Sequence, residues 1–284
     1  MIIATTPLSL MLIGDRRAAL SLTIHAHERV VVHQPAPPFR NRFTVRHRET
    51  EHVNAISDIR HPLIRNALNY LRIRDGLDLT VISDLPDRES PTTRTLSLLH
   101  ALHAFRQDEV NAEELARETL ILRQEDSDRT GAPFVAYASA YGGLCRLALG
   151  GWNHYEASPI RLDTERLTAL RDRLIVFLCD HPPPAPADVR PVPDAQALLE
   201  SQDDLDTFGQ LLHDPDQRDP RYLAARDAGA LGGTFTADTE TDGFLLLYAP
   251  PETHAAIRAA LGDLTELPFR FCMEGSRTTL LDTP

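Results

Sequence analysis

A run of prolines between residues 181 and 193 places the strongest limit on how this chain can fold. Its members are Pro182, Pro183, Pro184, Pro186, Pro191 and Pro193. Because each proline lacks an amide donor and crowds the preceding helical turn, this density excludes a helix and indicates an extended connector. The 284 residues also exceed one average domain. We therefore expect two lobes, residues 1–155 and 156–284, with the connector inside the second lobe.

Hydrophobic periodicity assigns strands and helices along both lobes. Expected strands cover residues 18–33, 40–45, 77–82, 243–248 and 269–272, and the second is expected to pair with the first. Expected helices begin at Pro62, after residues 90–93 with a threonine cap, at Asn111 with a capping box to Glu114, and at Glu252. Strands and helices that alternate with antiparallel hairpins indicate an α+β protein.

Composition limits the classes of molecule that we expect the protein to bind. The formal charge is -12, whereas a nucleic-acid-binding face needs clustered positive charge, so we expect no nucleic-acid partner. All 29 basic residues are arginines, which excludes Schiff-base chemistry and a phosphate-loop lysine. The chain does not begin with a basic stretch followed by a long apolar run. We therefore expect a cytoplasmic location and no membrane partner.

Cysteines and histidines are the residues most suited to holding a transition metal. Cys145, Cys179 and Cys272 are far apart and odd in number, which favours buried, reduced thiols over disulfides or a paired-cysteine metal site. His25 and His27 lie two residues apart on an expected strand, so their side chains share a face. Such a pair is typical of metal sites on strands, but a histidine pair without a fixed third ligand usually has a structural role. Metal binding by this pair is therefore one hypothesis.

Two blocks of sequence follow the order found in a known family of kinases. The first comprises residues 59–65, 79–86, 113–118 and 140–144, and the second comprises residues 228–233, 243–248, 266–271 and 274–277. Over this span the chain resembles the GHMP kinase superfamily, and most of all the branch that phosphorylates D-glycero-D-manno-heptose 7-phosphate. The resemblance implies a two-lobed GHMP kinase-like fold, with an N-terminal mixed α/β lobe and a C-terminal ferredoxin-like lobe. It also implies a substrate and nucleotide site between the lobes.

The motifs with which this family handles ATP are changed here. Where the family has a glycine-rich phosphate loop, residues 87–95 contain no glycine. The resemblance puts Val135 at the position of the catalytic aspartate, and valine cannot take a proton. Residues 234–243 keep only Gly243 of a second glycine-rich loop and gain three acidic side chains. Acidic groups repel phosphate and suit a solvated turn or a cation site, so we expect degenerate nucleotide and catalytic motifs.

Several residues are candidates for contacts with a ligand. Thr93 or Thr95 offers a hydroxyl for magnesium, and Arg94 offers a positive charge for an anion. The resemblance also brings Glu125 near the family's magnesium-binding glutamate. The candidate ligand-binding residues are Asp15, Arg16, Thr92, Thr93, Arg94, Thr95 and Tyr137, and the candidate metal ligands are Glu125 with Thr93, and His25 with His27.

These observations leave three hypotheses about function. The first is a pseudokinase, repurposed to bind a sugar phosphate or related small molecule, to pair with an active homologue or as a homodimer, or to catalyse a different reaction between the lobes. The second is a divergent sugar-phosphate kinase that uses Mg²⁺ and ATP through Thr93, Arg94 and Glu125. The third is an enzyme of another class, of specialised metabolism, built on the histidine-bearing lobe. Function must be argued from the site, so the geometry around these residues decides between them.

Overall fold

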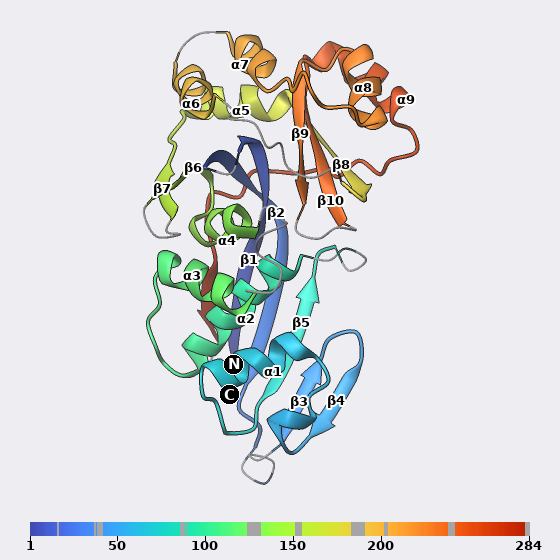
Figure 1. Cartoon of the computed structure of the whole chain (residues 1–284). Helices are drawn as coiled ribbons and strands as arrows, with labels where there is room; N and C mark the ends of the chain where they lie inside the picture. The colour runs from blue at the N-terminus through green and yellow to red at the C-terminus, as the bar shows by residue number, and fades with distance from the viewer. Residues whose placement is uncertain are drawn as a thin grey trace.

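The computed structural model describes residues 1–284 except for residues 16, 37, 39–41, 86–87, 89, 124–131, 151–154, 183–190, 202–203, 238–241 and 282–284. The described residues form two lobes, and each lobe is built on one sheet. Figure 1 shows a long hairpin of the larger sheet that extends from the lower lobe to the smaller upper lobe, and both chain ends in the lower lobe. The predicted α+β, two-lobed architecture is confirmed.

The larger sheet is built around strands β1 (Ile2–Gly14) and β2 (Ala18–His33), which pair along almost their whole length. The sheet order is β11-β1-β2-β5-β3-β4, and β6 and then β7 continue from β2. The remaining strands are β3 (Phe43–Arg46), β4 (Thr50–Val53), β5 (Asp78–Ser83), β6 (Leu144–Leu149), β7 (Tyr155–Pro159) and β11 (Arg277–Leu280). Strand β11 thus returns the end of the chain to the first lobe, while a division of the chain after residue 155 stays a prediction.

Helices α1 (Pro62–Tyr70), α2 (Pro91–Phe105), α3 (Ala112–Leu122) and α4 (Ala132–Tyr141) pack on this sheet (Figure 1). Pro62 at the first position of α1 and the capping box between Asn111 and Glu114 confirm two predicted helix starts. The N-cap of α2 is Ser90, so the predicted threonine cap is wrong. Pro91 occupies the first helical position, where no amide donor is missed, and this leaves the cap position to the preceding serine.

The smaller sheet is antiparallel, with the order β8-β10-β9. Its strands are β8 (Leu174–Asp180), β9 (Gly232–Ala237) and β10 (Asp242–Tyr248), and its helices are α5 (Thr164–Asp172), α6 (Val192–Glu200), α7 (Leu205–Leu211), α8 (Pro220–Asp227) and α9 (His254–Ala260). Beside β8, Glu266 forms an isolated bridge with Phe177. This bridge marks a rudimentary fourth strand, which completes the strand order of a ferredoxin-like lobe.

The tip of the β1–β2 hairpin packs against the smaller lobe and joins the two cores. Leu10 and Leu22 of the hairpin share a buried cluster with Leu246 and Tyr248 of β10. The alternate β10 residues Leu245 and Leu247 pack on the opposite face with residues of α8 and α9. This alternation is the period-2 pattern expected of a strand buried on both faces. One continuous apolar contact therefore holds the hairpin against the smaller sheet.

Three expectations about elements need correction. The strand expected at residues 40–45 is Phe43–Arg46, and it pairs with β4 and β5 and not with β2, because β5 already occupies that part of the edge of β2. Residues 269–272 form no strand; they meet β2 through one bridge, between Phe271 and Ile24. The connector is shorter than expected, since α6 begins at Val192 and holds Pro193 in its first turn, where proline is tolerated.

Candidate functional site

A gap in the pairing of β2 brings distant residues together. One edge of β2 pairs with β1, while the other pairs with β6 over residues 18–22 and with β5 over residues 28–33. Residues 23–27 lie between these two partners. Their backbone groups are satisfied by other segments: His25 N donates to Arg270 O at 2.9 Å, and Cys272 N donates to Thr23 O at 2.9 Å. Buried backbone groups require such partners, so the gap recruits the 270–272 segment.

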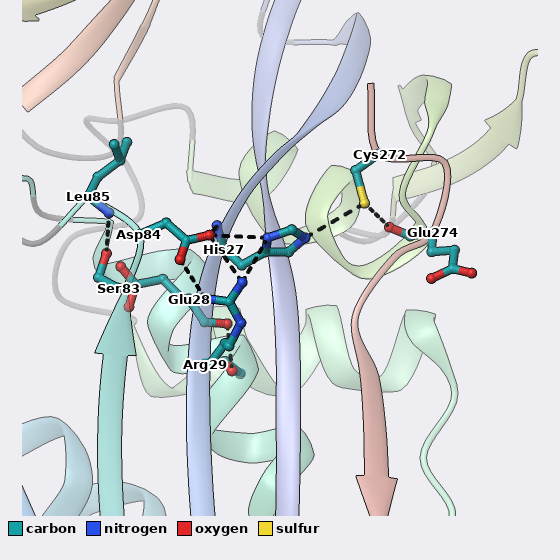
Figure 2. A network of polar contacts seen from close by, with 9 residues as sticks. His27, Glu28, Arg29, Ser83, Asp84, Leu85, Cys272 and Glu274 are labelled. Carbon is teal, nitrogen blue, oxygen red and sulfur yellow. Dashed lines mark hydrogen bonds and ion pairs between the residues drawn. The ribbon is translucent and has the colours of Figure 1, made fainter. Parts of the chain in front are cut away.

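Asp84 closes the β5 side of the gap (Figure 2). It follows the last residue of β5, and its backbone amide donates to His27 O at 3.0 Å, while its Oδ2 accepts from His27 N at 3.0 Å. The Nδ1 of the His27 ring lies 3.3 Å from the same carboxylate oxygen. Arg29 donates to Asp84 Oδ1 at 2.5 Å and to Oδ2 at 3.2 Å. The carboxylate is therefore fixed in place by backbone, imidazole and guanidinium together.

Burial and charge set the protonation of this network. Burial, assisted by the neighbouring Arg29, lowers the pKa of His27, so its imidazole is neutral near pH 7. Burial alone would raise the pKa of Asp84, but the hydrogen bond and charge of Arg29 hold that pKa below its usual value. Because an ionised carboxylate accepts hydrogen bonds and cannot donate them, we assign the imidazole proton to Nδ1. The lone pair of Nε2 is then available on the other side of the ring.

Cys272 lies on that other side of His27 (Figure 2). Its Sγ is 3.9 Å from His27 Nε2, and Sγ also lies 3.4 Å from Glu274 O. The side chain of His25 completes a cluster in which one ligand atom each of His25, His27 and Cys272 lie within 4.8 Å of one another. Burial raises the pKa of the Cys272 thiol. An acid–histidine–cysteine arrangement with a buried, protonated thiol is poorly suited to nucleophilic catalysis, which needs a thiolate.

The segment that replaces the phosphate loop contacts the other lobe. Arg88 forms ion pairs with Asp180, at the end of β8, and with Asp242, at the start of β10, the latter at 3.2 Å. Burial alone would lower the pKa of Arg88, but these two carboxylates raise it. Asp242 is an acidic residue of the altered 234–243 loop, in which residues 238–241 lie outside the described residues. Asp242 therefore serves as an ion-pair partner of Arg88.

The predicted ligand-binding residues at the start of α2 are buried. Thr92, Thr93 and Thr95 have 0% exposed surface. Thr93 Oγ1 lies 3.0 Å from Ser90 Oγ, and Thr95 Oγ1 donates to Pro91 O at 2.6 Å. Arg94 Nε lies 3.3 Å from Glu28 Oε2 in an almost fully buried ion pair. In the described part of the loop, these three side-chain groups therefore all make contacts within the protein.

Val135 and Tyr137, both on α4, also lie in the interior. Val135 is 5% exposed and Tyr137 is 0% exposed. The Tyr137 ring packs on Tyr155 of β7 with 5.5 Å between centroids, and burial raises the pKa of Tyr137. Tyr137 belongs to the main apolar cluster of the first lobe. Packing in the interior is therefore sufficient to explain both residues.

The remaining candidates lie away from this region or cannot be placed. Asp15 Oδ1 accepts from Arg17 N at 2.6 Å and from Ala18 N at 3.0 Å, which is a local turn at the tip of the β1–β2 hairpin. Arg16 and Glu125 fall outside the described residues. Ligand binding by these residues, by the α2 threonines and by Arg94 stays a prediction.

Four residues meet at the gap in β2, and the sequence pointed to two of them. His25 and His27 were candidates because of their spacing, whereas Asp84 and Cys272 were not. Asp84 is 57 residues and Cys272 is 245 residues from His27 along the chain. The available signal for Asp84 was its place directly after a strand, at the start of the altered phosphate loop. Cys272 carried no local signal, because a single cysteine near an apolar run is most often a core residue.

Solved structures share this fold over nearly the whole chain. A D-glycero-D-manno-heptose 1-phosphate kinase from Bacteriodes thetaiotaomicron has a TM-score of 0.76 and 15% identity, and the match covers 100% of both chains. A galactokinase from Lactococcus lactis, complexed with galactose, has a TM-score of 0.71 and 14% identity over 99% of this chain and 95% of that one. A phosphomevalonate kinase from Streptococcus pneumoniae, in complex with phosphomevalonate and AMPPNP, has a TM-score of 0.65 and 11% identity over 96% and 100%. No protein-family model and no curated protein matches the sequence.

The chain therefore has the fold of the GHMP kinase superfamily, as the resemblance of its sequence motifs implied. A sugar-phosphate kinase stands among the structures that it matches over their full length. One fold can carry many activities, so the residues of the site have to decide which activity this chain has.

Proposed function

We propose that this protein has lost ATP-dependent phosphoryl transfer and binds a sugar phosphate or related small molecule between its lobes. The observation that carries the proposal is the ion-pair cluster of Arg88 with Asp180 and Asp242. In a kinase of this fold, the corresponding loop would present backbone amides to the phosphates of the nucleotide. Here Arg88 of that loop is neutralised by two carboxylates.

Electrostatics argue against a nucleotide at this place. A phosphate that approached Arg88 would meet Asp180 and Asp242, and like charges a few ångströms apart repel by about 1 kcal/mol even at the dielectric constant of water. The hydroxyls of Thr93 and Thr95, which would be needed for magnesium, are buried and hydrogen-bonded. Val135 offers no carboxylate to orient the acceptor alcohol. Glu125 lies outside the described residues, and each of the other groups named here is replaced or already engaged.

The proposed ligand class comes from the compared structures. The galactokinase holds galactose, and the phosphomevalonate kinase holds phosphomevalonate, each on the fold that this chain shares. A compact polar molecule with hydroxyl and phosphate groups is therefore the ligand class we propose.

Calorimetric titration separates the two parts of this proposal. We expect no saturable heat with Mg²⁺ and ATP, and saturable binding of heptose 7-phosphate without nucleotide. Saturable ATP binding that is abolished by Thr93→Val would overturn the loss of phosphoryl transfer, since valine keeps the shape of threonine and removes the hydroxyl. A folded protein that binds neither compound would refute the sugar-phosphate part. Circular dichroism and a cooperative thermal transition serve as the control for folding.

A direct assay addresses the divergent-kinase alternative. The protein is incubated with Mg²⁺, ATP and heptose 7-phosphate, and ADP release is followed against a preparation that lacks the sugar phosphate. We expect equal, background rates in both. Sugar-dependent ADP release that is lost in Thr93→Val would establish a kinase in spite of the altered loops, because positioning and electrostatics supply much of phosphoryl-transfer catalysis.

A further inference from the structure

We propose that His25, His27 and Cys272 bind a zinc ion and leave its fourth coordination position open. Two imidazoles and one thiol meet at the gap in β2, with their ligand atoms within 4.8 Å of one another. This site is independent of the proposed sugar-phosphate binding and goes beyond it. The three ligands come from one strand and from a segment near the end of the chain, so the site exists only in the folded protein.

The separation of His27 Nε2 from Cys272 Sγ matches zinc coordination after a small contraction, and the ligand atom of His25 lies within 4.8 Å of both. Zinc binds histidine nitrogen at about 2.0–2.1 Å and cysteine sulfur at about 2.3 Å, in tetrahedral geometry. These bond lengths place a coordinating nitrogen and sulfur about 3.5 Å apart. In the structure His27 Nε2 and Cys272 Sγ are 3.9 Å apart. A shift of a few tenths of an ångström, which side-chain rotation supplies, closes the difference.

Asp84 fits the role of the outer partner of a zinc-binding histidine. Such histidines usually donate their second ring N–H to a carboxylate, which fixes the ring and leaves the other nitrogen to the metal. His27 has Asp84 Oδ2 3.3 Å from Nδ1, and its Nε2 points toward Cys272 (Figure 2). Arg29 and the backbone of His27 in turn hold the carboxylate. A ring whose only role was packing would not need this orientation.

The backbone holds the ligands in place before any ion binds. Thr23 accepts from the Cys272 amide at 2.9 Å, and its hydroxyl donates to Cys272 O at 2.5 Å. His25 N is bonded to Arg270 O. The register of β1 and β2 shifts at Pro7 and Leu8, so that residues 25 and 26 of β2 have no partner in β1. Such bulges redirect side chains beside functional sites, and this one lies at the histidine pair.

The ligand set selects zinc and implies an open position. A thiolate combined with imidazoles is a preferred donor set of Zn²⁺, whereas Mg²⁺ and Ca²⁺ require oxygen ligands. Structural zinc sites have four protein ligands, while sites with three keep one position for water or substrate. His27 and Cys272 are buried, whereas His25 is exposed. The open position therefore lies on the side of His25, where water or an oxygen-bearing ligand has access.

Zinc binding is tested on the full chain, stripped with a chelator and titrated with Zn²⁺ by calorimetry, with metal content measured by mass spectrometry. We expect one equivalent to bind. His25→Ala and Cys272→Ser should each weaken binding at least tenfold. The matched controls are His33→Ala, an exposed histidine of the same strand, and Cys179→Ser, a buried cysteine of the other lobe, which should leave the affinity unchanged.

Two further readouts identify the ligands even where a variant folds poorly. Co²⁺ in place of Zn²⁺ should give a thiolate-to-metal charge-transfer band in the wild type and in Cys179→Ser. Asp84→Asn should weaken zinc binding by about 10-fold to 100-fold while the cobalt band persists, because it alters the outer partner and not a ligand. The proposal would be overturned if the folded wild-type protein did not bind zinc. It would also be overturned if His25→Ala and Cys272→Ser bound zinc as tightly as the wild type.

Discussion

Glu28 and Arg94 form the most deeply buried ion pair among the described residues, with side chains 1% and 10% exposed. Removing one partner of a buried ion pair costs about 3–5 kcal/mol, because the interior screens charge poorly. We therefore expect Arg94→Ala to lower the free energy of unfolding by about 3 kcal/mol in urea denaturation. The exposed pair of Arg60 with Glu49 is the control: its side chains are 79% and 78% exposed. Arg60→Ala should change stability by less than about 1 kcal/mol.

An equal loss in the two variants would mean that solvent reaches Arg94 and screens its charge. That outcome would also reopen the possibility that Arg94 binds an anion, because the guanidinium would then be accessible. A large loss for Arg94→Ala instead assigns the residue to the interior, between β2 and α2.

His100, on α2, makes stability depend on pH. Burial, with a smaller contribution from the charge of His103, lowers the pKa of His100 to about 4, and its Nδ1 lies 2.8 Å from Ser276 Oγ. Between pH 6.5 and 4 the unfolded chain binds the proton and the folded protein does not, so stability falls as the pH falls. His47, whose pKa burial also lowers to about 4, acts in the same direction.

His100→Gln keeps a hydrogen-bonding side chain and removes the titrating group. The stability lost between pH 6.5 and 4.5 should therefore be smaller by about 2 kcal/mol in this variant than in the wild type. Urea denaturation at a series of pH values measures the difference. The control is His181→Asn at an exposed position with a φ of 47°, a conformation that asparagine tolerates. An unchanged pH dependence in His100→Gln would show that His100 is protonated equally in both states.

At the scale of elements, the segment before β11 packs closely on the end of α4. A Cβ added to Gly275 would lie 2.1 Å from Ala140 O, a backbone atom that cannot move away alone. Gly275→Ala should therefore destabilise the protein by about 2 kcal/mol, because the added methyl group overpacks a site that has no room for it. Because Gly275 follows the segment that carries Cys272, we also expect weaker zinc binding.

Gly262→Ala is the matched control in thermal denaturation. A Cβ at Gly262 would have its nearest neighbour at 3.6 Å, which is ordinary contact. This variant should keep the wild-type melting temperature within a few degrees. If Gly275→Ala were as stable as Gly262→Ala, the close approach of the 272–276 segment to α4 would be wrong, and with it the position of Cys272.

The sequence predicted elements well where local rules act. The capping box at Asn111 and the proline at the start of α1 depend on neighbouring residues alone, and both predictions are confirmed. Strand β1 was not predicted, because Pro7 interrupts its pattern, yet the structure places Pro7 at a register shift, where proline is tolerated in a strand. The gap in β2 could not be predicted, since it depends on where β5 and β6 end. The meeting of Asp84, His27 and Cys272 depends on that gap.

At the scale of the whole molecule, two different kinds of contact join the lobes. The hairpin tip contributes apolar packing, together with a hydrogen bond from Met11 N to Thr236 Oγ1 of 2.8 Å. Arg88 adds a polar contact between the loop after β5 and the strands β8 and β10. Among the described residues no helix is both long and apolar enough to cross a bilayer.

Substitution of Arg88 tests whether the altered phosphate loop now joins the lobes. The side chain of Asp242 is 18% exposed, whereas that of Asp180 is 72% exposed, so solvent screens the second pair more strongly. In double-mutant cycles with alanine, we expect a coupling energy of about 1–2 kcal/mol between Arg88 and Asp242, and of less than about 0.5 kcal/mol between Arg88 and Asp180. Urea denaturation supplies the four free energies for each cycle.

Hydrogen exchange locates the effect. In Arg88→Ala, amides at the end of β8 and the start of β10 should exchange faster, while those of the α3 helix, remote from the contact, should be unchanged. Coupling near zero in both cycles would mean that Arg88 does not hold the lobes together and that its charge is available to a ligand. In that case the loop would keep an anion-binding group, and only Val135 and the buried threonines would still disfavour a nucleotide.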